Sequence, residues 1–150
     1  MQDTGVYARE LPQLDRVIEI GIAGGRVLSV SFPERIPDDA ERDHPLLDRV
    51  LATLEGETDD FEDVQVALTM PTGQRAVLEA TRKIPYGDTV TVEQVARMAG
   101  LDPEDAEDLR TVRTALRENP VALLIPDHRV TDADGATPAE IARQLRELEG

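Results

Sequence analysis

The chain has 150 residues, of which 40% are hydrophobic, 31% are charged and none is cysteine, and its formal net charge is −15 at pH 7. That length suits one domain or two small lobes, and no stretch approaches the ~20 apolar residues that span a bilayer. Without cysteine, disulfides, thiolate nucleophiles and cysteine-type zinc sites are excluded. The first residues have neither the basic start nor the apolar stretch of a signal peptide, so we expect a cytoplasmic protein with no membrane partner.

The acidic charge has two interpretations. One is a protein that nucleic acid repels. The other is adaptation to a salt-rich cytoplasm, because Lys83 is the only lysine and the 31 acidic residues are scattered along the chain. At molar salt the Debye length falls to about 3 Å, so the net charge would repel DNA only weakly. We favour the halophile interpretation, under which local groups of arginines say more about partners than the net charge does.

The first 70 residues predict a small lobe of strands and one helix. Alternating apolar and polar residues indicate strands that a hairpin turn at Gly24 and Gly25 connects. Apolar residues at helical spacing follow. In chain order we predict strands within 1–32, above all at 17–22 and 26–32, a polar connection over 33–43, a helix over 45–54, an acidic loop over 55–63 and a short strand over 64–68.

Residues 71–150 predict a mainly helical second lobe. Thr91 and Gln94 have the spacing of a capping box at a helix start, and Gly100 suits the end of that helix. Two short helices joined by a polar connection have the scale of a helix-turn-helix, which can place its second helix in a DNA groove. In chain order we predict helices over 72–83, 91–99, 106–117 and 138–149, a buried strand-like run over 121–125, and Ile141, Leu145 and Leu148 facing inward from the last helix.

Three arginines share one face of the predicted 106–117 helix, because Arg110, Arg113 and Arg117 are spaced i, i+3 and i+7. A guanidinium group can bind a phosphate through two hydrogen bonds, so one interpretation is a surface that contacts DNA. The other is an ordinary solvated helix surface, paired with neighbouring acids. Those acids are Glu107, Asp108 and Glu118. The residues alone leave both interpretations open.

A second polar group, Asp127, His128 and Arg129, follows the apolar run and Pro126. A rigid segment thus places polar side chains at the edge of the hydrophobic core. The histidine could be a hydrogen-bonded structural residue, a metal ligand or a general base, and Asp127 could act with it as a nucleophile or base. No further ligands stand at the spacing of a metal motif and no oxyanion-hole motif accompanies the pair. We therefore favour a polar binding site without a metal.

Several motifs, in this order, resemble those of the O6-alkylguanine-DNA alkyltransferases. They are Ile-Pro-Tyr-Gly-Asp-Thr at 84–89, Arg110 to Pro120, and Val-Ala-Leu-Leu-Ile-Pro-Asp-His-Arg-Val at 121–130. The resemblance implies an α+β protein with a ribonuclease-H-like α/β lobe over 1–70 and a helical, winged-helix-like DNA-binding lobe over 71–150. It also implies DNA repair as the process, double-stranded and possibly alkylated DNA as a partner, excision-repair proteins as further partners, and no cofactor.

The resemblance carries over residue by residue. Asp127 stands where the family has its alkyl-accepting cysteine, so no intact catalytic site and no enzyme is implied. Asn119, His128 and Glu149 match the hinge asparagine, the base, and the acid that orients the base. Arg110 matches the arginine that fills the gap left by a flipped nucleotide. The implied DNA-binding residues are Arg110, Arg113, Arg117, Thr91 and Tyr86, and the implied pocket residues are Pro126, Asp127 and Arg129.

Three features depart from the family pattern. Val92 stands at the position of a tyrosine, Arg113 and Thr114 replace small glycines of the recognition helix, and residues 131–137 lack the lid that follows the active site. Cysteine-free relatives, the alkyltransferase-like proteins, bind O6-alkylguanine without repairing it. We therefore expect a non-catalytic protein that senses O6-alkylguanine or distorted DNA. The alternatives are a protein-interaction or regulatory module on the same scaffold, or an activity that depends on Asp127 and His128.

Overall fold

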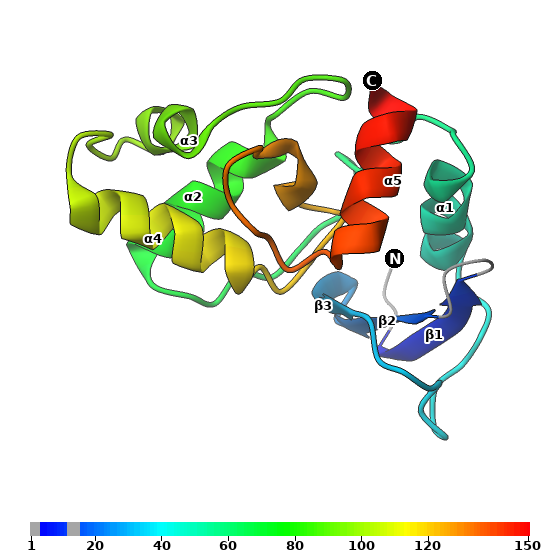
Figure 1. The fold of residues 1–150 in the computed structure, drawn as a ribbon. Helices are drawn as coiled ribbons and strands as arrows, with labels where there is room; N and C mark the ends of the chain where they lie inside the picture. Colours follow the sequence, from blue (N-terminus) through cyan, green and yellow to red (C-terminus); the bar gives the residue numbers. More distant parts are fainter. Residues whose placement is uncertain (1–3, 12–15) are drawn as a thin grey trace.

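The computed structural model describes residues 4–11 and 16–150, and the predicted strands within 1–32 fall in part outside this range. A small sheet and one helix lie at one end, a group of three helices lies at the other, and the last helix stands between them (Figure 1). The elements are β1 (Gly5–Leu11), β2 (Arg16–Ala23), β3 (Arg26–Ser31), α1 (Pro45–Leu54), α2 (Thr72–Arg82), α3 (Val92–Met98), α4 (Ala106–Arg117), η1 (Asp127–Arg129) and α5 (Ala139–Glu149). The predicted α+β class is confirmed.

The sheet is antiparallel, with the strand order β1-β2-β3. Gly24 and Gly25 form the predicted hairpin turn with φ angles of 58° and 78°, which glycine adopts without steric cost. Helix α1 coincides with its prediction and packs on β1. The predicted strand over 64–68 is wrong. Val66 forms only an isolated bridge to Val27, so this segment touches the edge of the sheet without extending it.

Helices α2, α3 and α4 pack against one another at the other end of the molecule. The predicted capping box is confirmed, since Gln94 N donates to Thr91 and the Gln94 side chain accepts from Thr91 N. Gly100, with a φ of 79°, follows the end of α3 as predicted. Helix α4 covers residues 106–117, as expected, and its apolar side is buried. The local sequence therefore determined these helix boundaries well.

The segment 119–130 connects α4 to the centre of the molecule. All of residues 121–130 are buried, as their apolar character predicts, but the strand is wrong. Leu123 has a φ of 76° and Ile125 N donates to Val121 O, so the run forms a turn. A bond from Val30 N to Pro120 O ties its start to β3. Tertiary packing fills the core here with a bent segment, and η1 follows directly.

Helix α5 contacts both η1 and α1 and so joins the two ends of the fold. Ile141 and Leu145 face the core as predicted, whereas Leu148 is 39% exposed and that prediction is wrong. Leu148 lies in the last turn of the helix, where little of the protein remains to cover it. No helix in the described part of the chain is long and apolar enough to cross a membrane.

Candidate functional site

Asp127 opens η1, and only 1% of its surface is exposed. Its Oδ2 accepts hydrogen bonds from the Asn119 side-chain amide and from Ala136 N–H, both at 3.0 Å, and from Thr137 N–H at 3.4 Å. Its Oδ1 is also buried and has no hydrogen-bond partner among the described residues. Burial raises the pKa of Asp127 above its ordinary value of 3.8, although hydrogen bonds from Thr137, Asn119 and Ala136 act against it.

Gly135 lies directly against the Asp127 carboxylate. A Cβ placed on residue 135 would stand 2.3 Å from Asp127 Cγ and 2.4 Å from Oδ1. Only a residue without a side chain fits there. The segment 133–137 therefore folds over Asp127, with a glycine on Oδ1 and the next two backbone N–H groups on Oδ2.

Asn119 shapes the loop that carries Asp127. Its Oδ1 accepts from Val121 N–H at 3.0 Å, and its Nδ2 donates to Ile125 O and to Asp127 Oδ2. The side chain is 3% exposed and both of its polar atoms are bonded. Asn119 thus fixes the path of residues 119–127 and lies beside Asp127; its part in a functional site stays a prediction.

His128 and Glu149 form a buried pair. His128 Nε2 lies 2.7 Å from Glu149 Oε2, and the two side chains are 3% and 8% exposed. Burial by itself raises the pKa of Glu149, but hydrogen bonds and charge from His128 and Arg129 outweigh it and lower the pKa to about 2. Because this carboxylate stays ionised, it accepts a hydrogen bond, and Nε2 carries the proton. His128 Nδ1 is buried with no hydrogen-bond partner among the described residues.

Arg129 faces away from Asp127. Its guanidinium binds both Glu149 oxygens, at 2.8 and 3.1 Å, donates to Ile84 O at 2.7 Å and lies 5.5 Å from the centroid of the Tyr86 ring. Arg129 therefore compensates the charge of Glu149, and no arginine among the described residues pairs with the Asp127 carboxylate. It anchors the C-terminal end of α5 to the turn after α2.

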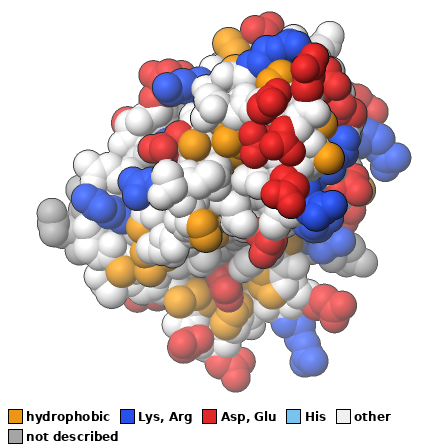
Figure 2. Space-filling view, turned by 90° about the vertical axis from the view of Figure 1, so that its left-hand side faces the viewer, with side chains coloured by type: hydrophobic (Ala, Val, Ile, Leu, Met, Phe, Trp, Pro, Cys, Tyr) orange, Lys and Arg blue, Asp and Glu red, His pale blue; other side chains and the backbone are white. Residues whose placement is uncertain are grey.

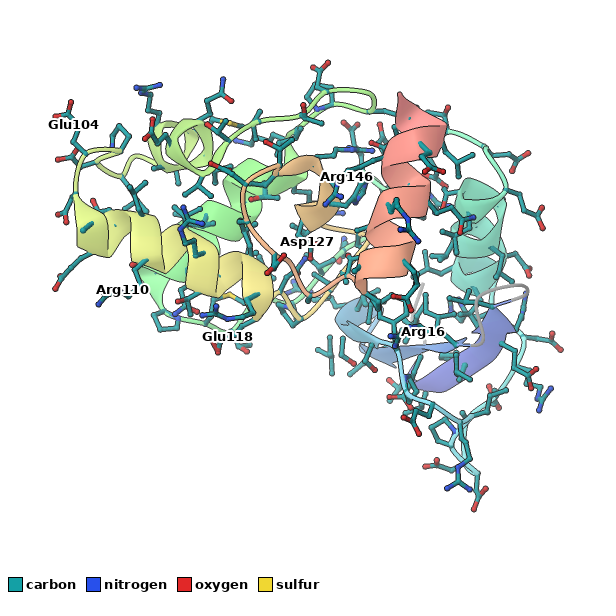
Figure 3. All side chains as sticks on the ribbon, viewed as in Figure 1. Arg16, Glu104, Arg110, Glu118, Asp127 and Arg146 are labelled. Atoms are coloured by element: carbon teal, nitrogen blue, oxygen red, sulfur yellow. The ribbon has the colours of Figure 1, made fainter. Side chains whose placement is uncertain are left out.

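A hollow of about 310 Å³ lies beside this cluster, lined by Asp127, His128, Ala142, Arg146 and residues 133–139. Arg146 reaches from α5 toward η1 (Figure 3), and its Nε donates to His128 O at 2.9 Å. Of the three predicted pocket residues, only Asp127 lines this hollow. Pro126 and Arg129 line a separate one of about 240 Å³, together with Tyr86.

The predicted arginine face of α4 is exposed at Arg110, Arg113 and Arg117, and Arg110 points away from the molecule (Figure 3). Within the described residues, none of the three forms an ion pair with the neighbouring acids Glu107, Asp108 or Glu118; the ion pairs lie elsewhere in the molecule.

The three arginines differ in their contacts. Arg113 donates to Asp132 O at 2.9 Å, and Asp132 Oδ1 in turn accepts from Val92 N–H at the start of α3. Arg113 thus holds the loop after η1 against α4, and the Asp132 side chain connects the same loop to α3. Figure 2, which looks at the end of the molecule where the three helices lie, shows acidic and basic side chains interspersed, so the cations here act within a mixed surface.

Thr91 and Tyr86, also predicted to contact DNA, have structural contacts. The Thr91 hydroxyl accepts from Gln94 N–H at the start of α3. The Tyr86 hydroxyl donates to Leu148 O at 3.3 Å, so this side chain lies against α5. The structure therefore separates Tyr86 from the α4 arginines, and DNA contact by either residue stays a prediction.

Sequence reasoning missed several residues of the site. Gly135, Ala136 and Thr137 contribute through a missing side chain and two backbone N–H groups, and backbone donors leave no mark on a sequence. Arg146 lies one helical turn before Glu149 on α5, a spacing that places both on one helix face and could have suggested it. In residues 4–11 and 16–150, no cluster of three or more histidine, aspartate or glutamate side chains could hold a metal ion.

Comparisons with known proteins identify the chain's relatives. Residues 72–150 match the family model described as 6-O-methylguanine DNA methyltransferase, DNA binding domain. A methylated-DNA–protein-cysteine methyltransferase of Metallosphaera sedula is 35% identical over 100 residues, covering 64% of this chain and 60% of that protein. A protein of Thermus thermophilus named DNA base-flipping protein is 39% identical over 87 residues, covering 57% and 55%. The chain thus aligns with somewhat more than half of these relatives' lengths.

The fold agrees with these relatives. A crystal structure of Mycobacterium tuberculosis OGT in complex with DNA superposes with a TM-score of 0.75 at 25% identity, covering 96% of this chain and 91% of that one. A crystal structure of Mycobacterium tuberculosis O6-methylguanine methyltransferase superposes with a TM-score of 0.74 at 25% identity, covering 97% of this chain and 93% of that one. The similarity extends through the first 70 residues, which the family model does not match.

The names of these relatives correct one expectation, that the protein is not an enzyme. Several curated relatives carry the name methylated-DNA–protein-cysteine methyltransferase, which is the name of an enzyme. The 150 residues nevertheless contain no cysteine, so the thiol acceptor in that name has no counterpart here. Since the family model covers 72–150 and the fold match covers 96% of the chain, the protein belongs to the 6-O-methylguanine DNA methyltransferase family.

Proposed function

We propose that this protein binds duplex DNA through α3 and α4 and recognises O6-alkylguanine, or a distorted base pair, in the hollow beside Asp127. The observation that carries the proposal is the α4 surface, where Arg110 and Arg117 are exposed and, among the described residues, form no ion pair with the neighbouring acids. In a chain with 31 acids and 16 bases, two exposed arginines on one helix face form a local positive group on an otherwise acidic protein. DNA phosphates would supply the missing anions.

The domain division supports the same proposal. We take residues 71–150 as the DNA-binding lobe and residues 1–70 as a supporting lobe, since the family model begins at residue 72 and the three α4 arginines follow it. The hollow of about 310 Å³ lies in the second lobe, between η1 and α5, and its lining of small residues includes the polar side chains of Asp127, His128 and Arg146, which suit a base edge. A target base would reach it only when rotated out of the duplex.

The experiment compares two duplexes of identical sequence, with and without one O6-methylguanine, by fluorescence anisotropy at several salt concentrations. We expect the wild type to bind the modified duplex more tightly. Arg110→Ala should weaken binding by about tenfold or more, because a hydrogen bond to a charged group contributes about 1.5–3 kcal/mol. It should also reduce the slope of log affinity against log salt by about one.

Arg26→Ala is the matched control. Arg26 is exposed at the start of β3, in the sheet at the opposite end of the molecule, and its removal changes the net charge by the same amount. Equal binding by Arg110→Ala and Arg26→Ala would show that α4 makes no special contact.

The excision-repair partners that the resemblance implies belong to this proposal as well. A pull-down on bead-bound modified duplex, with unmodified duplex as the reference, tests them.

A further inference from the structure

The two oxygens of Asp127 have opposite environments. Oδ2 receives three hydrogen bonds, two from backbone N–H groups and one from the Asn119 amide. Oδ1 receives none from the described residues. Donors aimed at one oxygen of a carboxylate are the arrangement that stabilises negative charge developing on that oxygen when the carbon between the two is attacked. The remaining oxygen keeps its lone pairs for another atom.

His128 follows Asp127 in the chain and has a ring nitrogen that can accept a proton. Its Nε2 is held by the ionised Glu149, so its Nδ1 is the nitrogen with a free lone pair, and Nδ1 has no partner among the described residues. Both Asp127 and His128 line the hollow of about 310 Å³. An aspartate, a histidine and a second acid that orients the histidine together form a nucleophile and a general base. Figure 3 shows Asp127 at the centre of the molecule, where η1 faces α5.

We propose that Asp127 is an alkyl acceptor that regenerates, so that the protein removes O6-alkyl groups from guanine over many cycles. The inference rests on the proposed recognition of O6-alkylguanine and goes beyond it. In the first step Asp127 Oδ1 attacks the alkyl carbon. The bond from that carbon to guanine O6 breaks, and the departing guanine anion takes a proton from water. The product is an alkyl ester on Asp127.

In the second step His128 Nδ1 removes a proton from a water molecule, and the resulting hydroxide attacks Asp127 Cγ. Negative charge then develops on Oδ2, where Asn119, Ala136 and Thr137 already direct their N–H groups. The alkoxide leaves with the proton from His128, and the carboxylic acid that remains gives its proton to the hydroxide left by the first step, which restores the carboxylate. The overall reaction consumes one O6-alkylguanine and one water and yields guanine and an alcohol. A thiol acceptor has no such second step, because a thioether does not hydrolyse.

Access to Oδ1 requires a local movement. Gly135 covers this oxygen, so residues 133–135 must withdraw before the alkyl carbon can reach it. The hydrogen bond from Thr137 and the one from Asn119 lie outside that segment, so two of the three donors on Oδ2 can stay in place. The hollow of about 310 Å³ is lined by the same residues 133–135, so open space lies beside them.

The test incubates the protein with excess modified duplex in water enriched in heavy oxygen. We expect guanine and methanol in several equivalents per protein molecule and heavy oxygen in the peptide that contains Asp127, because water attacks Cγ. Asp127→Asn should give neither product. His128→Gln should take up one alkyl group and stop, seen as an intact-mass gain of one methylene group. Arg26→Ala should behave as the wild type.

Each outcome bears on a distinct claim. Duplex binding is measured in the same samples, so tight binding of modified DNA without guanine formation overturns this inference and leaves the proposed function standing. A stable wild-type adduct without turnover also overturns it, because hydrolysis is then missing. Loss of preferential binding overturns the proposed function itself. Circular dichroism of each variant confirms the fold, and guanine formation by a folded Asp127→Asn variant would assign the chemistry to another residue.

Discussion

Replacement of Gly135 by alanine tests the packing on which the whole site depends. The added Cβ would lie 2.3 Å from Asp127 Cγ, 2.4 Å from Oδ1 and 2.6 Å from Asp127 Cβ, whereas carbon atoms in contact lie about 3.5–4.0 Å apart. Asp127 cannot turn aside without leaving its three donors. The backbone at residue 135 must therefore move and weaken the bond from Ala136.

We expect Gly135→Ala to lower the free energy of unfolding by about 2–4 kcal/mol, which combines overpacking with the loss of one hydrogen bond to a buried carboxylate. Urea denaturation measures it, and the melting temperature should fall by about 2–4 °C for each kcal/mol. Gly73→Ala is the control. Its Cβ meets Thr111 Cγ2 at an ordinary 3.6 Å inside α2, so it should be neutral or stabilise by about 0.5–1 kcal/mol.

A double-mutant cycle separates the clash from other effects of residue 135. Asp127→Ala removes Cγ and Oδ1, the two atoms that the new Cβ would approach most closely, and leaves only Cβ, so the double variant should lose clearly less stability than the sum of the two single changes. Additivity within about 0.5 kcal/mol would refute the contact between Gly135 and Asp127, as would a Gly135→Ala variant as stable as Gly73→Ala.

Three further predictions concern the partners of Asp127 and His128. The pKa of Glu149 in the folded protein is about 2, against an ordinary 4.5, so the folded state binds fewer protons than the unfolded state between these pH values. The free energy of unfolding should therefore fall as the pH drops from 4.5 toward 2, and Glu149→Gln should reduce this fall in urea titrations at each pH. An unchanged pH dependence would contradict the low pKa. Asn119→Ala leaves the buried Val121 N–H, Ile125 O and Asp127 Oδ2 without a hydrogen bond that they have in the wild type. It should lower the free energy of unfolding by about 2–3 kcal/mol in urea denaturation, so a loss under 0.5 kcal/mol would count against the hinge role. Asp127→Cys places a thiol next to His128 and should take up one alkyl group from modified duplex as a stable mass gain that Asp127→Ala lacks; no gain in a folded, DNA-binding variant would contradict the placement of this site.

Much of the fold follows from local sequence. Helix α1 and helix α4 begin and end where apolar spacing and turn residues predict, and the capping box at Thr91 is formed as its spacing indicates. Helical periodicity and caps involve residues within a few positions of each other, so a sequence displays them directly. The exposed stripe of arginines on α4 is predictable for the same reason.

The predictions that are wrong concern segments whose backbone conformation depends on contacts with distant parts of the chain. The runs 64–68 and 121–125 have strand-like composition, yet one forms a single bridge and the other a turn with a positive φ at Leu123. A short apolar run fits a buried turn as well as a strand, and only its neighbours in space distinguish them. Arg129, which the resemblance places in the pocket with Asp127, instead pairs with Glu149, 20 residues away.

The amino-acid sequence by itself determined that this protein has no thiol and that Asp127 precedes His128 in the alkyltransferase-like motif at 121–130. It also determined that three arginines share a helix face. These are properties of residue identity and short-range spacing. Only the tertiary structure decided what Asp127 can do, because its environment comes from Asn119, Gly135, Ala136 and Thr137, two of which act through backbone N–H groups and one through the absence of a side chain. Hydrogen-bond geometry and burial arise from packing between segments, and no pattern along the chain encodes them locally.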